Sequence, residues 1–153
     1  RGPSGEVQGE VTSPLMVEEV EGALNGVLER LREEGLIAAV LRAGNAPVFP
    51  RAYVMLRNVE ISSRSIGGSA TRSSQEYELV FEGLGADPLE QYNKVLRAAL
   101  RAYELIREDP TLGVSGADVL AFPVELRRTD YVDQGKRAVV LSMTVRVSVE
   151  SSP

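Results

Sequence analysis

Residues 136–149 read KRAVVLSMTVRVSV, and their pattern decides the fold. Apolar side chains occupy every second position from Val139 to Val149, whereas serine, threonine and arginine occupy most positions between them. Because successive side chains of a strand point to opposite faces, this alternation predicts one strand with a buried face. Fourteen residues would span roughly 45 Å, far beyond the usual strand of ~5–6 residues. We therefore expect part of this strand to project from the domain.

A second strand is predicted just upstream, over residues 119–128. Four apolar residues alternate in it: Leu120, Phe122, Val124 and Leu126. Pro123 lies among them and cannot donate a hydrogen bond to a neighbouring strand, which indicates an edge strand or a bulge. The polar residues 127–135 predict a hairpin connection to the long strand.

A helix is predicted before these strands. Asp87 suits its N-cap and Pro88 its first position, and the helix should end before Asp109-Pro110. The apolar residues that recur at helical spacing, and that we expect to face the core, are Leu89, Tyr92, Leu96, Ala99, Leu100, Tyr103 and Ile106.

In the first half of the chain, too, a helix is predicted to precede two strands. A helix is predicted from Pro14 to about Glu34, capped by Gly35, with Gly22 and Gly26 explained by close packing. Its apolar face consists of Val17, Val20, Leu24, Val27, Leu28 and Leu31. The apolar run 36–41 suits either a short strand or a continuation of the helix.

Two strands should follow, over residues 52–61 and 76–82, joined by a polar loop at 62–75. The first carries apolar residues on both faces, which predicts a central strand covered on two sides. The second alternates apolar residues with Glu76, Glu78 and Glu82. We expect these three carboxylates to line a solvated or channel-lining face.

These elements predict an α+β domain over residues 15–150, with order α-β-β-α-β-β and two helices packed on a largely antiparallel four- to five-stranded sheet. Residues 1–14 are rich in Gly, Pro and Ser, and are interpreted as an N-terminal arm or a tag remnant.

Composition limits the chemistry that is open to the chain. It contains neither Cys nor His, which removes thiolate nucleophiles, imidazole bases and Cys/His zinc sites. Its net charge of -5 argues against binding nucleic acid by phosphate neutralisation. The sequence shows neither a long apolar run nor a signal peptide, so we expect a soluble intracellular protein that needs no cofactor or metal.

The residues allow three weak catalytic or metal interpretations. A Ser–Lys pair is conceivable, the glutamates at 76, 78 and 82 could hold a cation or act as paired carboxylates, and Asp130 and Asp133 could bind Ca²⁺. No His is available to activate a serine, and the EF-hand spacing is absent around the two aspartates. The glutamates would lie roughly 7 Å apart along the strand, which glycosidases use, but a solvated or channel-lining strand face explains them better. A basic cluster of Arg64, Arg72, Arg127 and Arg128 on the two polar connections is better explained as a protein contact than as a nucleic-acid site.

The ordered set of features resembles the tail-terminator proteins of long-tailed (siphovirus) bacteriophages over about residues 16–149. The resemblance lies in an N-terminal helix, a strand beginning Phe49-Pro50-Arg51-Ala52-Tyr53-Val54, a polar hairpin, a helix closed by Asp109-Pro110-Thr111-Leu112-Gly113, and a final hairpin with a charged tip.

This resemblance implies a non-catalytic subunit of the virion, located at the head-proximal end of the tail and assembled in the host cytoplasm. Six copies would form a ring that stops polymerisation of the tail-tube protein and binds the head connector, while DNA passes without specific binding and no membrane is involved. Contacts with other subunits would involve Arg64, Gly67, Gly68, Arg72, Arg127, Arg128, Asp130, Tyr131 and Asp133, and the glutamates at 76, 78 and 82 would line the lumen.

Two alternatives stay open. The chain could be another phage neck protein, such as a head-closure or tail-to-head joining subunit, or it could be a small α+β enzyme or ligand-binding domain. A deep pocket with convergent polar groups would favour the latter.

Overall fold

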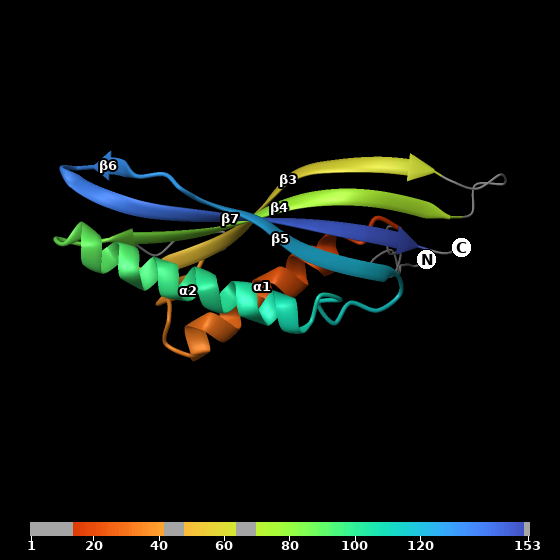
Figure 1. Cartoon of the computed structure of the whole chain (residues 1–153), viewed down its shortest axis with the longest axis horizontal. Coiled ribbons are helices and arrows are strands. Elements are labelled where there is room, and N and C mark those ends of the chain that lie inside the picture. The colour runs from red at the N-terminus through yellow and green to blue at the C-terminus, as the bar shows by residue number, and fades with distance from the viewer. Residues whose placement is uncertain (1–13, 42–47, 64–69, 152–153) are drawn as a thin grey trace, which may run out of the picture.

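The computed structural model describes residues 14–41, 48–63 and 70–151, which form two helices and six strands (Figure 1). In chain order these are α1 (Val17–Glu33), β2 (Ala39–Val40), β3 (Arg51–Ser63), β4 (Thr71–Leu84), α2 (Pro88–Glu108), β5 (Asp118–Arg128), β6 (Tyr131–Asp133) and β7 (Lys136–Ser151).

The strands form one mixed sheet in the order β2-β3-β4-β7-β5, and β6 pairs with the beginning of β7. Among the described residues, β2 and β3 run parallel and the other pairings are antiparallel. The α+β class is therefore confirmed, whereas the expected strand count misses the short strands β2 and β6. The run 36–41 contributes β2, which settles its role in favour of a strand.

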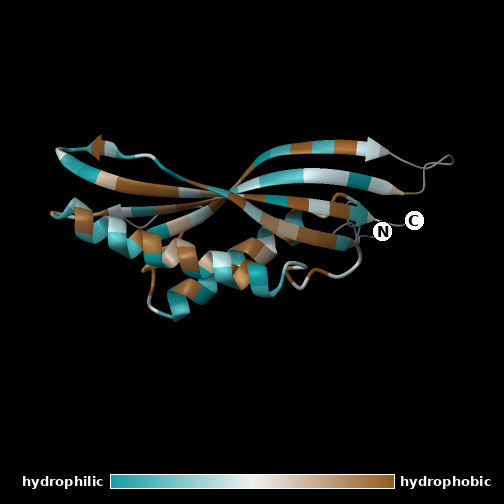
Figure 2. Ribbon diagram, viewed as in Figure 1, coloured by the Kyte–Doolittle hydropathy of each residue, from teal (hydrophilic) through white to brown (hydrophobic). Residues whose placement is uncertain are grey.

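β7 is a central strand of the sheet, between β4 and β5. The expectation that part of it projects from the domain is wrong for the residues that are paired on both sides. Along one side, β4 pairs with it from Ala138 to Ser151, and along the other side β6 and β5 follow one another. Alternate residues from Val139 to Val149 are buried, as the sequence predicted. Figure 2 shows apolar and polar residues alternating along the strands of this strongly twisted sheet.

Both helices lie on the same side of the sheet (Figure 1). The core between helices and sheet is aliphatic, with Tyr77 and Phe81 of β4 among the largest fully buried side chains. Residues of α1 in this core are Val20, Leu24, Leu28 and Leu31. The face of the sheet opposite to the helices is called the open face below.

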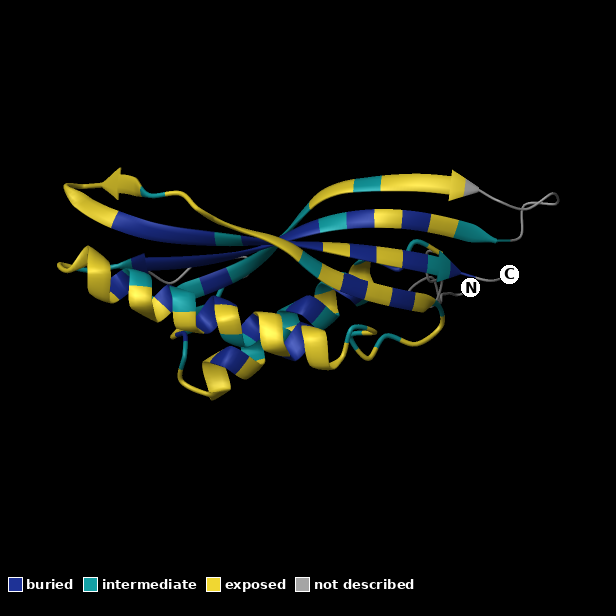
Figure 3. Ribbon diagram, in the orientation of Figure 1, coloured by how far each residue is buried: buried dark blue, intermediate teal, exposed yellow. Residues whose placement is uncertain are grey.

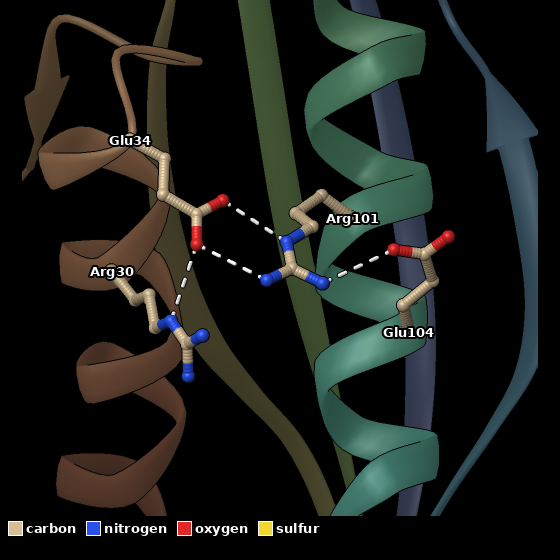
Figure 4. Close-up of polar contacts among 4 residues, drawn as sticks. All are labelled: Arg30, Glu34, Arg101 and Glu104. Carbon is tan, nitrogen blue, oxygen red and sulfur yellow. Dashed lines mark hydrogen bonds and ion pairs between the residues drawn. The ribbon is translucent and has the colours of Figure 1, made fainter.

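α1 behaves largely as predicted, and Gly35 ends it with a left-handed φ of 79°. The explanation of Gly22 and Gly26 by close packing is wrong, because both are exposed and a Cβ on either would meet nothing within 4 Å. α1 is instead tied to α2 by Arg101, whose Nε and Nη2 lie 3.0 and 3.1 Å from the Glu34 carboxylate (Figure 4).

α2 has its predicted bounds, and the Asp87 carboxylate accepts hydrogen bonds from the N–H groups of Leu89 and Glu90. The predicted face is buried only in part. Ala99 and Ile106 lie in the core and Tyr92 and Leu96 pack against it, whereas Leu89 and Leu100 are 67% and 48% exposed. The buried positions are Gln91, Val95, Ala98, Ala99, Ala102, Leu105 and Ile106. The three alanines let the helix approach the sheet closely, and Leu89 and Leu100 lie outside this buried face.

The β3–β4 hairpin is longer than predicted, since β3 extends to Ser63 and β4 begins at Thr71. The expected polar loop at 62–75 is therefore wrong for residues 62–63 and 71–75, which are strand, and residues 64–69 lie outside the described residues. β3 is also not covered on two sides. β2 pairs only with Arg51 and Ala52, and Ile61 at the far end of β3 is 59% exposed.

Candidate assembly surfaces

Arg72 lies far from Arg127 and Arg128, with which it was expected to cluster. Arg72 is paired across the sheet with Glu150, whereas Arg127 is paired with Ser142. Eight residues of β7 separate these positions, which is roughly 26 Å of strand. The predicted basic cluster is therefore wrong. Arg64, Gly67 and Gly68 lie outside the described residues, and their role stays a prediction.

The connection at 127–135 is mostly ordered strand and not a loop. Arg127 and Arg128 end β5, residues 131–133 form β6, and Gln134-Gly135 make a tight turn with φ of 52° and 78°. Positive φ at both residues is typical of a type I′ hairpin.

Asp130 serves this connection by binding Arg128. Its carboxylate accepts hydrogen bonds of 3.0 and 2.9 Å from Nε and Nη2 of Arg128, and this contact holds the pKa of Asp130 below its usual range. The same guanidinium lies 4.8 Å from the centre of the Tyr92 ring. The geometry supports ordinary turn chemistry at Asp130.

The open face carries the three predicted glutamates, and each has an arginine within ion-pair distance. Glu82 Oε1 lies 2.7 Å from Arg51 Nε, and Glu76 Oε1 lies 3.7 Å from Arg146 Nη2. Glu78 Oε2 has two cations near it, at 3.8 Å from Arg57 Nε and 3.7 Å from Arg127 Nη2.

These pairs change the expected character of the face. Glu78 and Glu82 are each only 7% exposed, so the prediction of a solvated acidic strand is wrong for two of the three residues. A buried carboxylate is costly unless it is paired, and the arginines supply the compensating charge. The open face is therefore a surface of mixed charge.

Aromatic side chains frame the Arg51–Glu82 pair. The Arg51 guanidinium lies 4.4 Å from the centre of the Phe49 ring, and Tyr131 is near enough for the charges of Glu82 and Arg51 to affect its pKa. Burial raises the pKa values of Tyr53 and Tyr131, and the nearby Glu82 carboxylate adds to both shifts. Tyr131 of β6 thus lies near the start of β3, whereas sequence reasoning assigned it only to partner binding.

An apolar groove between α2 and β5 is the second surface, and sequence analysis missed it because its residues were assigned to the core. It encloses about 310 Å³. Its lining residues are Leu100, Tyr103, Pro123, Val124, Glu125, Leu126 and Met143. Pro123 was the available signal, since it indicated an edge strand whose side chains need not be buried. Figure 3 shows buried and exposed residues alternating over the first half of β5, whereas its second half is exposed.

Another hollow is an open trough of about 320 Å³ on the sheet. Arg72, Arg146 and Phe122 are among its lining residues, together with serines of β3, β4 and β7. Within residues 14–41, 48–63 and 70–151, no group of three or more acidic side chains is placed to hold a metal ion.

The sequence matches no protein-family model and no curated protein. Neither helix in the described part of the chain is long and apolar enough to cross a membrane.

Proposed function

We propose that this chain is a structural subunit of a bacteriophage tail, which assembles into a hexameric ring, ends polymerisation of the tail tube and joins the tail to the head connector. The observation that carries the proposal is the open face of the sheet, on which the glutamates of β4 are matched by arginines. Such a face offers surface for assembly and a wall past which DNA can move.

The charge on this face suits passage of DNA without binding. A wall that binds duplex DNA needs a net positive potential to neutralise phosphates. Here Arg51, Arg57 and Arg146 are each held by a glutamate of β4, so their charges are compensated locally. The surface that faces the lumen would then carry balanced positive and negative charge, and would not be purely acidic.

The order of features supports the same assignment. The Phe49-Pro50 peptide directly precedes β3, and Asp109-Pro110 closes α2. The final hairpin turns at Gln134-Gly135, which are flanked by the charged residues Asp133 and Lys136. These are the features by which the sequence resembles the tail-terminator family.

Size-exclusion chromatography with light scattering tests the ring on the full chain. We expect a species of about 100 kDa, six times the 16.6 kDa chain, and closed rings in negative-stain electron microscopy. Added to polymerising tail-tube protein, the chain should stop growth and be seen at one tube end. A protein that stays small at high concentration and leaves tube growth unchanged would contradict the proposal.

A charge substitution tests which face meets the lumen. Glu76→Arg would leave Arg146 uncompensated and make the open face locally basic, so the assembled ring should retain duplex DNA at low salt. Glu18→Arg makes the same charge change on the exposed surface of α1 and is the matched control. Equal DNA retention by both variants would contradict a lumen-facing sheet.

A further inference from the structure

The outer edge of β5 combines apolar side chains with an open side of the sheet. β5 is the last strand in the sheet order, and within the described residues no strand pairs with its outer side. Val124 and Leu126 on this strand are 48% and 40% exposed, and Leu100 and Tyr103 on the adjacent turns of α2 are 48% and 38% exposed. An apolar edge of this kind is a template for pairing with another chain.

The two halves of this edge differ in their backbone groups. In the first half, the Ala121 N–H donates to the Pro110 carbonyl at 2.7 Å, and Pro123 has no N–H. In the second half, the Thr129 N–H donates to the Val140 carbonyl of β7 at 2.8 Å. Because antiparallel pairing alternates, the peptide groups of Leu126 and Arg128 then point away from β7. The second half is therefore the part that can accept another strand.

The charges on the two sides of Leu126 are complementary to the same charges on an antiparallel second copy. Glu125 and Arg127 flank Leu126 and share the open face, where they are paired with Thr144 and Ser142. If a second β5 pairs antiparallel about Leu126, Glu125 of each copy lies opposite Arg127 of the other. One such contact forms two cross-strand ion pairs. Opposite charges on directly opposed residues stabilise strand pairing.

We propose that a second copy of this chain binds at the β5 edge, by antiparallel pairing of residues 124–128 about a two-fold axis at Leu126. This contact continues the sheet of one copy into that of the other. It also brings the two α2 helices side by side, so that Leu100 and Tyr103 of each copy are covered. The occupant is the chain itself, because its own charge pattern supplies the complement.

This contact is independent of the proposed ring. A two-fold contact uses the same patch on both copies and closes with two of them, whereas a ring needs a head-to-tail contact through different surfaces. In a ring, the β5 contact would join two rings or pair subunits before assembly. Dimer formation and ring formation can therefore succeed or fail separately.

Charge reversal tests the pairing by equilibrium sedimentation of the full chain. Glu125→Lys and Arg127→Glu each place two like-charge pairs in the contact, so each should raise the dimer dissociation constant about tenfold. The double variant E125K/R127E restores opposite charges and should recover most of the lost affinity. Glu60→Lys, an exposed charge change on β3, is the control and should leave the constant unchanged. No recovery in the double variant would overturn the register.

A cysteine placed on the axis gives a second test, because the chain has no cysteine of its own. Residues 126 of the two copies would have Cα atoms ~5.5 Å apart, which is within disulfide range. Leu126→Cys should form a disulfide-linked dimer under mild oxidation, whereas Leu89→Cys on α2, which replaces a side chain that is 67% exposed, should not. A Leu126→Cys chain that stays monomeric would overturn the β5 contact. Rings of this variant that form without the disulfide would also overturn the β5 contact, but the ring proposal would survive.

Discussion

The hydroxyl of Tyr77 donates a 2.6 Å hydrogen bond to the side-chain carbonyl of Gln75, two residues away on the same buried face of β4. The Gln75 amide in turn donates to the Leu15 carbonyl at 2.6 Å and to Ser73 Oγ at 3.0 Å. Tyr77 and Gln75 are both 0% exposed. This polar chain therefore joins β4 to the residues that precede α1.

Tyr77→Phe should destabilise the protein by about 1–3 kcal/mol, because Gln75 Oε1 would be left buried without a donor. The free energy of unfolding in urea measures this loss. Tyr103→Phe is the control, since its hydroxyl accepts a hydrogen bond from Arg107 at an exposed position and its removal should cost less than about 0.5 kcal/mol. Equal stabilities of the two variants would contradict a buried network.

The same network shows why the sequence could not give the bounds of β4. Ser73, Ser74 and Gln75 are polar and follow glycines, so their composition predicts a loop. In the structure Ser73 and Gln75 are buried because each has a polar partner supplied by the fold, and one partner comes from Leu15, 60 residues away. Local patterns contain no information about such a distant acceptor. The long strand β7 was predictable because its apolar period continues without interruption.

The candidate surfaces were harder to predict than the elements that carry them. The alternating apolar residues of β5 were correctly assigned to a strand, but their alternation did not show which face is buried. The structure buries Val119 and Ala121 and leaves Leu120 and Phe122 46% and 49% exposed. Burial of a strand face depends on what covers it, and α2 covers β5 only partly. The arginines that pair with the glutamates of β4 could likewise not be predicted, because the register of the strands was unknown.

Gly22→Ala and Gly26→Ala should each stabilise the chain by about 0.5–1 kcal/mol, because alanine restricts the unfolded chain and meets no atom within 4 Å. Chemical denaturation of each variant measures the gain. Gly83→Ala is the contrasting variant. Its Cβ would lie 3.1 Å from Val95 Cγ1 and from Gln91 Oε1 at a buried position, so it should lower stability. A loss at Gly22 or Gly26 would show that α1 is packed against another copy.

Arg51→Ala should destabilise the protein by about 2 kcal/mol, since it leaves the Glu82 carboxylate, 7% exposed, without its cation. Arg72→Ala removes an ion pair with Glu150 in which both side chains are more than 40% exposed, and should cost less than about 1 kcal/mol. Thermal unfolding at moderate salt compares the two. Similar losses would mean that the open face is more hydrated than its geometry indicates.

Arg101→Gln should flatten the dependence of stability on acid pH. The side-chain hydrogen bond from Arg101 is the main cause that lowers the pKa of Glu34, and it outweighs the opposing effect of burial. A carboxyl whose pKa is lowered by folding contributes stability above its unfolded pKa of about 4.3, and loses it as pH falls through the folded pKa. The wild-type melting temperature should therefore fall more steeply below pH 4.5 than that of the variant.

High salt provides the control for this effect. The Arg101–Glu34 contact is at the surface of the two helices, so its Coulombic part should weaken at ~1 M salt, where the screening length is about 3 Å. The difference between wild type and Arg101→Gln should then shrink at pH 7. Lys94→Gln removes an exposed positive charge from α2 and should leave the acid limb of the melting curve unchanged. If Arg101→Gln and Lys94→Gln behave alike between pH 3 and pH 5, Glu34 does not join the helices in solution.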